Sequence, residues 1–94
     1  IMVVCMEKSF GVGVALDVGM YLQTLMLGLE SRGISSCAQA SLRHYPDLVR
    51  KTLGISEDLR ILCGLSFGYE NPEDPANACR QRRRGIEANV TFVE

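Results

Sequence analysis

The stretch GISSCAQASLRHYP, residues 33–46, joins two segments that have helical patterns. Gly33 can adopt the left-handed backbone conformation that ends a helix, and Pro46 suits the first position of the next helix. We therefore expect residues 35–41 to form an irregular loop that makes few ladder hydrogen bonds. The backbone amides of such a loop are free to bind a ligand.

The segment before this loop has the pattern of a long, buried helix. Over residues 14–32, apolar side chains cover most of the helical circumference and leave a narrow polar stripe that includes Asp17 and Thr24. Gly19 and Gly28 each lower the helix propensity by about 1 kcal/mol relative to alanine. Their presence favours close packing of another backbone or a flat ring against this helix.

The other segments predict a sheet covered by helices. Residues 1–6 are continuously apolar, as in a strand buried on both faces, and residues 46–53 have a helical pattern. Residues 59–67 alternate in polarity and carry small side chains on one face, which indicates a helix pressed against that face. Residues 89–93 read as a last extended segment. This order predicts an α/β fold, an α+β sandwich with a mixed sheet and a long buried helix.

The composition describes one small domain. The chain has 94 residues, 47% of them hydrophobic, and a net charge of −1. Its core is modest without a partner surface, and the charge argues against binding to nucleic acid or to an anionic membrane. Asp17 and Glu30 interrupt the longest apolar run, so we expect no membrane-spanning segment. The chain opens inside an apolar strand without methionine or a leader, which favours a piece of a longer cytoplasmic protein.

The cysteines and the histidine do not form a recognisable reactive site. The four cysteines have no Cys-x-x-Cys spacing, which favours free thiols in a reducing compartment over a zinc site or a disulfide framework. The single histidine, His44, lies seven positions after Cys37 in a segment without the spacing of a nucleophile and its base. We therefore predict no catalytic side chain and no metal site.

Several motifs, taken in order, resemble the C-terminal half of the flavin-dependent nitroreductases. Besides residues 33–46, they are DVGM at 17–20, LGI at 53–55 and FGY at 67–69. The resemblance implies that residues 1–94 are the C-terminal portion of one FMN-binding domain in a homodimeric NAD(P)H oxidoreductase. Such an enzyme passes hydride through flavin N5 to nitroaromatic or quinone-like acceptors. In this family, the terminal strand of one subunit joins the sheet of its partner, which would give residues 90–92 an edge with which to pair.

The resemblance also implies that residues 38–41 bind the flavin ring. The amides of Ala40 and Ser41 would face the N5 and O4 edge, and Ala38 and Gln39 would lie along the ring. Backbone N–H groups can donate to this edge without adding charge or mobility. Many family members have a proline and an acidic residue where this chain has Ala38 and Ala40. Judged without the resemblance, an ordinary connection between two helices is the simpler interpretation.

The arginine-rich segment RQRRR, residues 80–84, is the second candidate site. Guanidinium groups bind a terminal phosphate through charge-assisted, bidentate hydrogen bonds. By resemblance Arg83 is the phosphate ligand and Arg80 or Gln81 assists it, although neighbouring positions depart from the family pattern and leave the register open by one residue. A solvated charge cluster is the alternative, and a nucleic-acid patch is less favoured because no aromatic residues lie between the arginines.

A second function remains open from the sequence. The chain could be a non-catalytic dimerisation or interaction fragment that binds no flavin on its own. The family's basic N-terminal motif is absent from this chain, and the loop at 35–41 differs from the family pattern. Both observations favour this alternative for the isolated chain, and flavin absorbance would distinguish the two.

Overall fold

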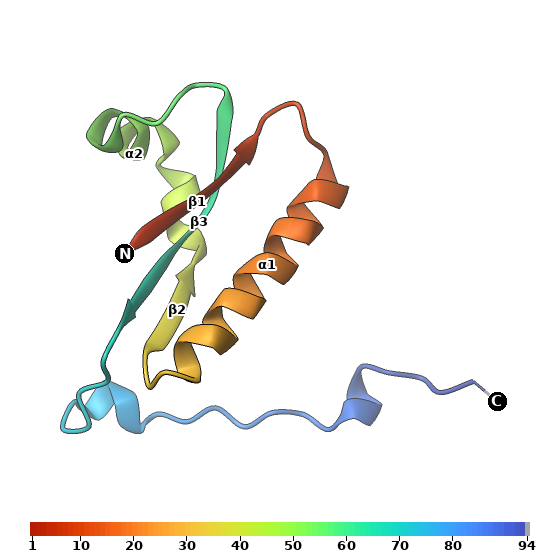
Figure 1. Ribbon diagram of the computed structural model, residues 1–94. Coiled ribbons are helices and arrows are strands. Elements are labelled where there is room, and N and C mark those ends of the chain that lie inside the picture. Colours follow the sequence, from red (N-terminus) through yellow and green to blue (C-terminus); the bar gives the residue numbers. More distant parts are fainter. Residues whose placement is uncertain (94) are drawn as a thin grey trace.

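Three antiparallel strands form the central sheet of the computed structural model, which describes residues 1–93 (Figure 1). The strands are β1 (Met2–Glu7), β2 (Ser35–Gln39) and β3 (Leu59–Gly68), arranged in the order β1-β3-β2. The predicted α+β class is confirmed. The mixed sheet is not seen among these strands, because β3 lies between β1 and β2 and pairs antiparallel with both.

The predicted irregular loop at residues 35–41 is wrong, because residues 35–39 form a strand and residues 40–41 begin a 3-10 helix. Gly33 has a φ of 70°, and the amide of Ile34 donates to the carbonyl of Leu29 at 3.1 Å, which ends the preceding helix as expected. The chain then reverses into β2, which pairs with β3 from Ser35 opposite Gly68 to Gln39 opposite Gly64. The exposed edge of β3 offers this segment hydrogen-bond partners that local sequence patterns do not reveal.

Two helical segments follow β2. The short 3-10 helix η1 (Ala40–His44) leads directly into α2 (Pro46–Leu53), which begins at Pro46 and ends at Gly54 with a φ of 66°. Both ends of α2 agree with the prediction, because proline fits the first helical position and glycine takes the left-handed conformation after the last one. η1 packs against β3, where Leu42 lies over Gly64, and α2 packs against η1.

The core lies on both faces of β3. Its buried apolar side chains are Val4, Met6, Val49, Ile61 and Leu65, and Leu65 is fully buried. Successive strand residues point to opposite faces, and a Cβ added to Gly64 would collide with Leu42 of η1. Leu65 therefore points to the face along which helix α1 (Val12–Glu30) lies, and the predicted close packing on the small face of β3 is confirmed at Gly64.

Helix α1 is not buried within this chain, which corrects the prediction for residues 14–32. It lies along β1 and β2, yet none of its residues is buried (Figure 1). The sheet covers only one side, so Leu22, Leu25 and Met26 are half-buried. The other side exposes large apolar side chains, namely Val12, Leu16, Met20, Tyr21 and Leu27. No atom of the described chain lies within 4 Å of where a Cβ would sit on Gly19 or Gly28, so the expected close packing at these glycines is not formed within residues 1–93.

Helix α1 is also long and apolar enough to cross a membrane, although Asp17 and Glu30 led us to expect no such segment. Its length of 19 residues and mean hydropathy of 1.5 would suffice to cross a membrane. The core helix of a soluble protein meets the same two criteria, so this observation is weak support for a membrane segment.

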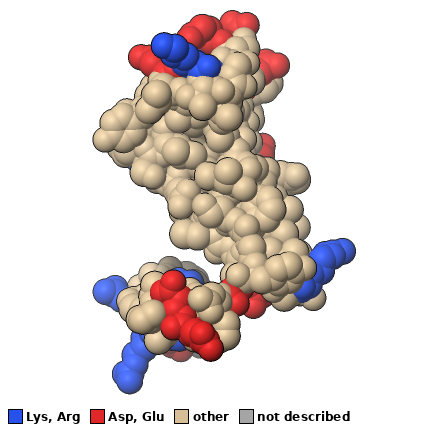
Figure 2. All heavy atoms as spheres, turned by 90° about the vertical axis from the view of Figure 1, so that its left-hand side faces the viewer, with Lys and Arg blue, Asp and Glu red and all other residues tan. Residues whose placement is uncertain are grey.

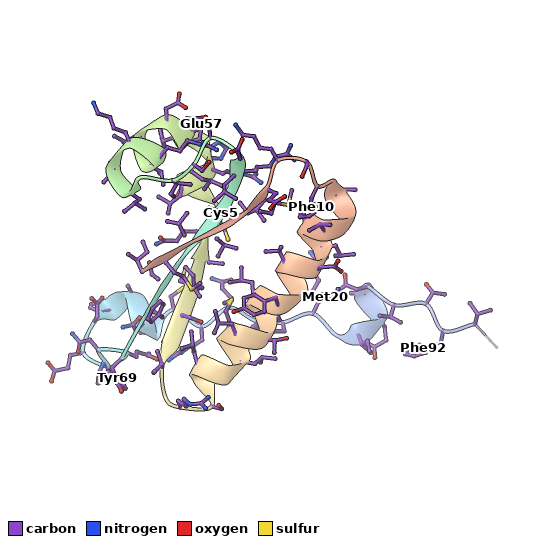
Figure 3. The ribbon with its side chains drawn as sticks, turned by 45° about the horizontal axis from the view of Figure 1, so that its top comes forward. Cys5, Phe10, Met20, Glu57, Tyr69 and Phe92 are labelled. Carbon is purple, nitrogen blue, oxygen red and sulfur yellow. The ribbon has the colours of Figure 1, made fainter. Side chains whose placement is uncertain are left out.

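The last part of the chain forms an arm that leaves the sheet (Figure 1). After β3 come two short 3-10 helices, η2 (Pro75–Ala78) and η3 (Ile86–Ala88), with extended backbone between them. The predicted strand at residues 89–93 is not formed within the described chain, since the sheet consists of β1, β2 and β3. Phe92 projects from the arm and is 74% exposed (Figure 3).

Candidate functional site

A cavity of about 800 Å³ lies where the arm passes the lower end of the sheet. It is lined by the end of α1, the start of β2, the end of β3 and the arm, and Figure 2 shows a hollow between the arm and the body of the molecule. The polar side chains that line it include Glu30, Ser35, Ser36, Ser66, Glu70, Asn71, Asn77, Arg80 and Arg83. Phe67 and Tyr69 add aromatic surface.

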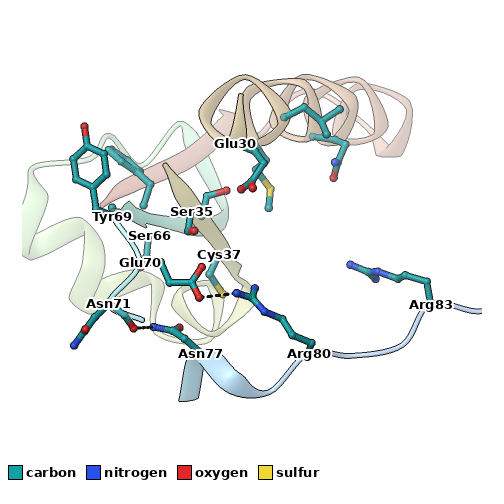
Figure 4. Close-up of a pocket in the computed structure, with 16 residues that line it drawn as sticks. Glu30, Ser35, Cys37, Ser66, Tyr69, Glu70, Asn71, Asn77, Arg80 and Arg83 are labelled. Carbon is teal, nitrogen blue, oxygen red and sulfur yellow. Dashed lines mark hydrogen bonds and ion pairs between the residues drawn. The ribbon is translucent and has the colours of Figure 1, made fainter. Parts of the chain in front are cut away.

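Two hydrogen bonds close the loop between β3 and the arm (Figure 4). The Nη2 atom of Arg80 donates to Oε1 of Glu70 at 2.6 Å, and the Nδ2 atom of Asn77 donates to the carbonyl oxygen of Asn71 at 2.8 Å. The polar turn at residues 71–75 is thus held at both ends. The same contacts fix the point at which the arm leaves the body.

The two predicted arginines lie together at this cavity but differ in their partners. Arg80 forms an ion pair with Glu70, whereas Arg83 has no carboxylate within 4.0 Å in the described part of the chain. Glu30, at the end of α1, lines the cavity as well (Figure 4). Arg82 and Arg84 do not line it, so the geometry favours Arg83 among the three consecutive arginines.

The predicted ring-binding residues lie outside the lining of this cavity. Ala38 and Gln39 belong to β2, and Ala40 and Ser41 form the first turn of η1. Ala38 directly follows Cys37, the last residue of β2 that lines the cavity, so it lies about 3.4 Å further along the strand. β2 is an edge strand, and every second amide of an edge strand points away from its neighbour. Amides at the start of a helical turn likewise lack partners within the turn.

Sequence reasoning missed Glu70, Asn77 and Ser66 as cavity residues. Glu70 and Arg80 are separated by ten positions, and only the fold of the intervening loop brings their side chains together. The neighbouring FGY motif was noticed, but it contains no signal for an ion pair. Ser66 lines the cavity because β3 continues to Gly68, where it pairs with Ser35 at the start of β2.

The thiols fall into two groups. Cys37 and Cys79 are exposed, and Cys37 lines the cavity. Burial raises the pKa of the Cys63 thiol. Burial also raises the pKa of the Cys5 thiol, and the nearby Arg50 offsets part of this shift by stabilising the thiolate. Within residues 1–93, no three histidine, cysteine or acidic side chains come together as metal ligands would.

Comparison with known proteins gives a consistent result. Residues 7–69 match the Nitroreductase family. The chain is 35% identical over 92 residues to a 4-nitrobenzoate reductase of Nocardioides sp., covering 98% of this chain and 37% of the relative. It is 43% identical over 79 residues to nitroreductase NfnB of Mycolicibacterium smegmatis, covering 84% of this chain and 33% of the relative.

Solved structures agree with the sequence matches. The crystal structure of the FMN-dependent nitroreductase NfnB from Mycobacterium smegmatis, in complex with NADPH, superposes with a TM-score of 0.90 at 37% identity. The superposition covers 98% of this chain and 41% of the chain in that crystal structure. The crystal structure of the FMN- and NADPH-dependent nitroreductase NfnB from Sphingopyxis sp. strain HMH gives a TM-score of 0.91 at 29% identity, with the same coverage.

The chain belongs to the nitroreductase family, as the family match over residues 7–69 shows. The resemblance noted in the sequence is thereby confirmed. The chain spans about a third of the length of the curated relatives it matches, 37% and 33% in the two cases above.

Proposed function

We propose that this chain is the C-terminal portion of an FMN-binding domain, and that the complete protein is an NAD(P)H-dependent oxidoreductase of the nitroreductase type. The observation that carries the proposal is the position of Arg80 and Arg83 at one cavity. The fold around that cavity superposes over 98% of the chain on an FMN-dependent nitroreductase crystallised with NADPH.

The residues present fit the phosphate end of FMN. The cavity volume of about 800 Å³ lies within the usual range of about 300–1,000 Å³ for small-molecule sites. Guanidinium groups bind phosphate by charge-assisted hydrogen bonds, and the hydroxyls of Ser35 and Ser36 add donors on the β2 side. In our proposal Arg83 holds the phosphate, and the assisting group is Gln81, or Arg80 when its ion pair with Glu70 opens.

The ring end of the cofactor belongs, in our proposal, along β2 and the start of η1. When bound, FMN supplies hydride transfer at N5. The chain's part is to orient the ring: the amides of Ala40 and Ser41 donate to the N5 and O4 edge, and Ala38 and Gln39 lie along it. Ala38 and Ala40 carry no ionisable group, so the ring environment depends on backbone dipoles rather than on side-chain charge.

The acceptors we propose are nitroaromatic or quinone-like compounds, and the assembly is a homodimer in the cytoplasm. The chain is similar to two 4-nitrobenzoate reductases, which supports a flat, electron-poor acceptor. Exposed apolar side chains on α1, such as Leu16 and Met20, and Phe92 and Val93 on the arm support a subunit interface. A partner surface would also supply the burial that this small chain lacks.

A non-catalytic dimerisation or interaction fragment remains the second candidate. The observation that favours it is the exposed apolar side of α1, which contains no buried residue. The chain also covers only 41% of the FMN-dependent relative, so the larger part of that relative has no counterpart here. On this reading, the chain alone would bind no flavin.

The test is flavin reconstitution of the complete purified protein. We expect a yellow protein with flavin absorbance that oxidises NADPH or NADH only when a nitroaromatic acceptor such as 4-nitrobenzoate is present. A colourless protein that takes up no FMN after removal and re-addition of the cofactor would contradict the proposal and support the interaction fragment. The present chain, expressed alone, serves as the comparison for partial binding.

A further inference from the structure

We propose that Glu70 selects which arginine of the arm binds the phosphate: it engages Arg80 and leaves Arg83 to bind the anion. Glu70 is therefore a positioning residue that acts through Arg80. This inference rests on the proposed function. It adds a residue that determines which arginine binds the phosphate, which the arginine cluster alone does not determine.

The geometry separates the two arginines. Arg80 Nη2 lies 2.6 Å from Glu70 Oε1, the short distance of a charge-assisted hydrogen bond. Arg83 lines the same cavity without a carboxylate within 4.0 Å in residues 1–93 (Figure 4). A phosphate that enters the cavity meets one guanidinium group already neutralised and one that is free. The free group attracts the anion, because Glu70 repels a phosphate that approaches Arg80.

The engagement of Arg80 is reversible. Its side chain is 76% exposed and that of Glu70 is 31% exposed, and ion pairs in such positions contribute little net stability. A phosphate dianion competes far better for Arg80 once Glu70 has lost its charge. Both arginine side chains already border the cavity, so this exchange requires rotation of a side chain rather than refolding of the arm.

The consequence is a rescue that a purely structural role for Glu70 would not produce. In the complete protein, Arg83→Ala should weaken FMN binding by about 10- to 150-fold, the factor that corresponds to one hydrogen bond to a charged group. Glu70→Gln keeps the side-chain shape and removes the charge, so it releases Arg80 to the phosphate. The double variant Glu70→Gln/Arg83→Ala should therefore bind FMN at least about fivefold more tightly than Arg83→Ala alone.

Two controls isolate the mechanism. Glu30→Gln removes a cavity carboxylate that forms no ion pair within residues 1–93, so Glu30→Gln/Arg83→Ala should recover much less affinity than the Glu70 double variant. Riboflavin lacks the phosphate, and its affinity should be the same in Arg83→Ala with and without Glu70→Gln. Fluorescence titration of the apoprotein measures both ligands.

The outcomes are distinct. Rescue of FMN binding by Glu70→Gln, with no change for riboflavin, supports the proposal. Equal or weaker binding by the double variant, or equal rescue by Glu30→Gln, overturns it and leaves the proposed function intact. Glu70→Ala/Arg83→Ala must also bind FMN more tightly than Arg83→Ala alone, because alanine removes the carboxylate partner of Arg80 entirely. A wild-type protein that binds no FMN overturns both this inference and the proposed function.

Discussion

The side chain of Leu42 lies directly against the backbone of Gly64, so that a Cβ at this strand position would overlap Leu42 Cδ1. Gly64 is paired with Gln39, the last residue of β2. The contact connects η1, and with it the proposed ring-binding amides, to the central strand of the sheet. A glycine in the middle of a strand weakens it in general, and here the close approach of Leu42 explains its presence.

Gly64→Ala should lower the free energy of unfolding by about 1–2 kcal/mol, in the lower part of the range for overpacking, because the obstructing atom is the flexible end of a side chain. In a Leu42→Ala background the same change should be nearly neutral. Gly68→Ala is the matched control, since no atom lies within 4 Å of a Cβ at that position. Denaturant unfolding followed by circular dichroism measures all four variants. Equal costs of Gly64→Ala in both backgrounds would show that Leu42 is not the cause.

Arg50 should stabilise the fold through its hydrogen bond rather than through its ion pair. Its side chain is 9% exposed and Nη2 donates to the carbonyl of Leu59, whereas Glu57, 3.6 Å from Nε, is 80% exposed. Arg50→Met keeps the apolar stem and should cost about 1.5–3 kcal/mol, the range for a hydrogen bond from a charged group. Glu57→Gln should cost less than about 1 kcal/mol, as exposed ion pairs do. Chemical denaturation would contradict this account if the two substitutions cost the same.

The cysteines should differ in reactivity, and the half-buried pair, Cys5 and Cys63, should make the free energy of unfolding decrease at high pH. Burial raises the pKa of Cys5 and Cys63 above the ordinary value of 9.0, so their thiols are protonated in the folded state at pH values where an unfolded chain has begun to ionise. Below pH 9, the stability that these protonated thiols contribute is therefore fully present. The free energy of unfolding then declines as the pH rises toward the raised pKa values of the folded state. Replacing both residues by alanine should flatten this decline.

The rate at which a thiol reagent modifies each cysteine at pH 8 tests the same prediction. Cys37 and Cys79 are exposed and should be modified first, with Cys5 and Cys63 following slowly. Mass spectrometry of the early products identifies the positions. Early modification of Cys63 in folded protein would contradict the burial on which the pH dependence rests.

Ser41 tests whether backbone amides hold the flavin ring. Its side chain is exposed in the first turn of η1, so Ser41→Ala should change flavin reduction by NAD(P)H little. Ser41→Pro removes an amide donor at a position in the first turn where proline is sterically tolerated, so it should lower both FMN affinity and the reduction rate. Stopped-flow absorbance measures the rate, and circular dichroism confirms folding. If alanine is as damaging as proline in folded protein, the hydroxyl carries the function.

Local patterns predicted the elements that have local causes. α2 begins at Pro46 and ends at Gly54, and β3 occupies almost the range that alternation indicated, because these signals depend on backbone conformation and on the two-residue period of a strand. The motifs also indicated the nitroreductase family, which the comparisons confirm. The resemblance to the family pointed to Arg80 and Arg83, and both line the cavity.

Only the tertiary structure decided what depends on distant partners. Residues 35–39 form a strand because β3 provides an edge, and α1 remains half-covered because the described sheet reaches only one of its sides. The sequence by itself determined that arginines gather in the arm. It could not determine that Glu70 engages Arg80 and leaves Arg83 unpaired within residues 1–93, since hydrogen bonds between side chains ten positions apart exist only once the loop between them has folded.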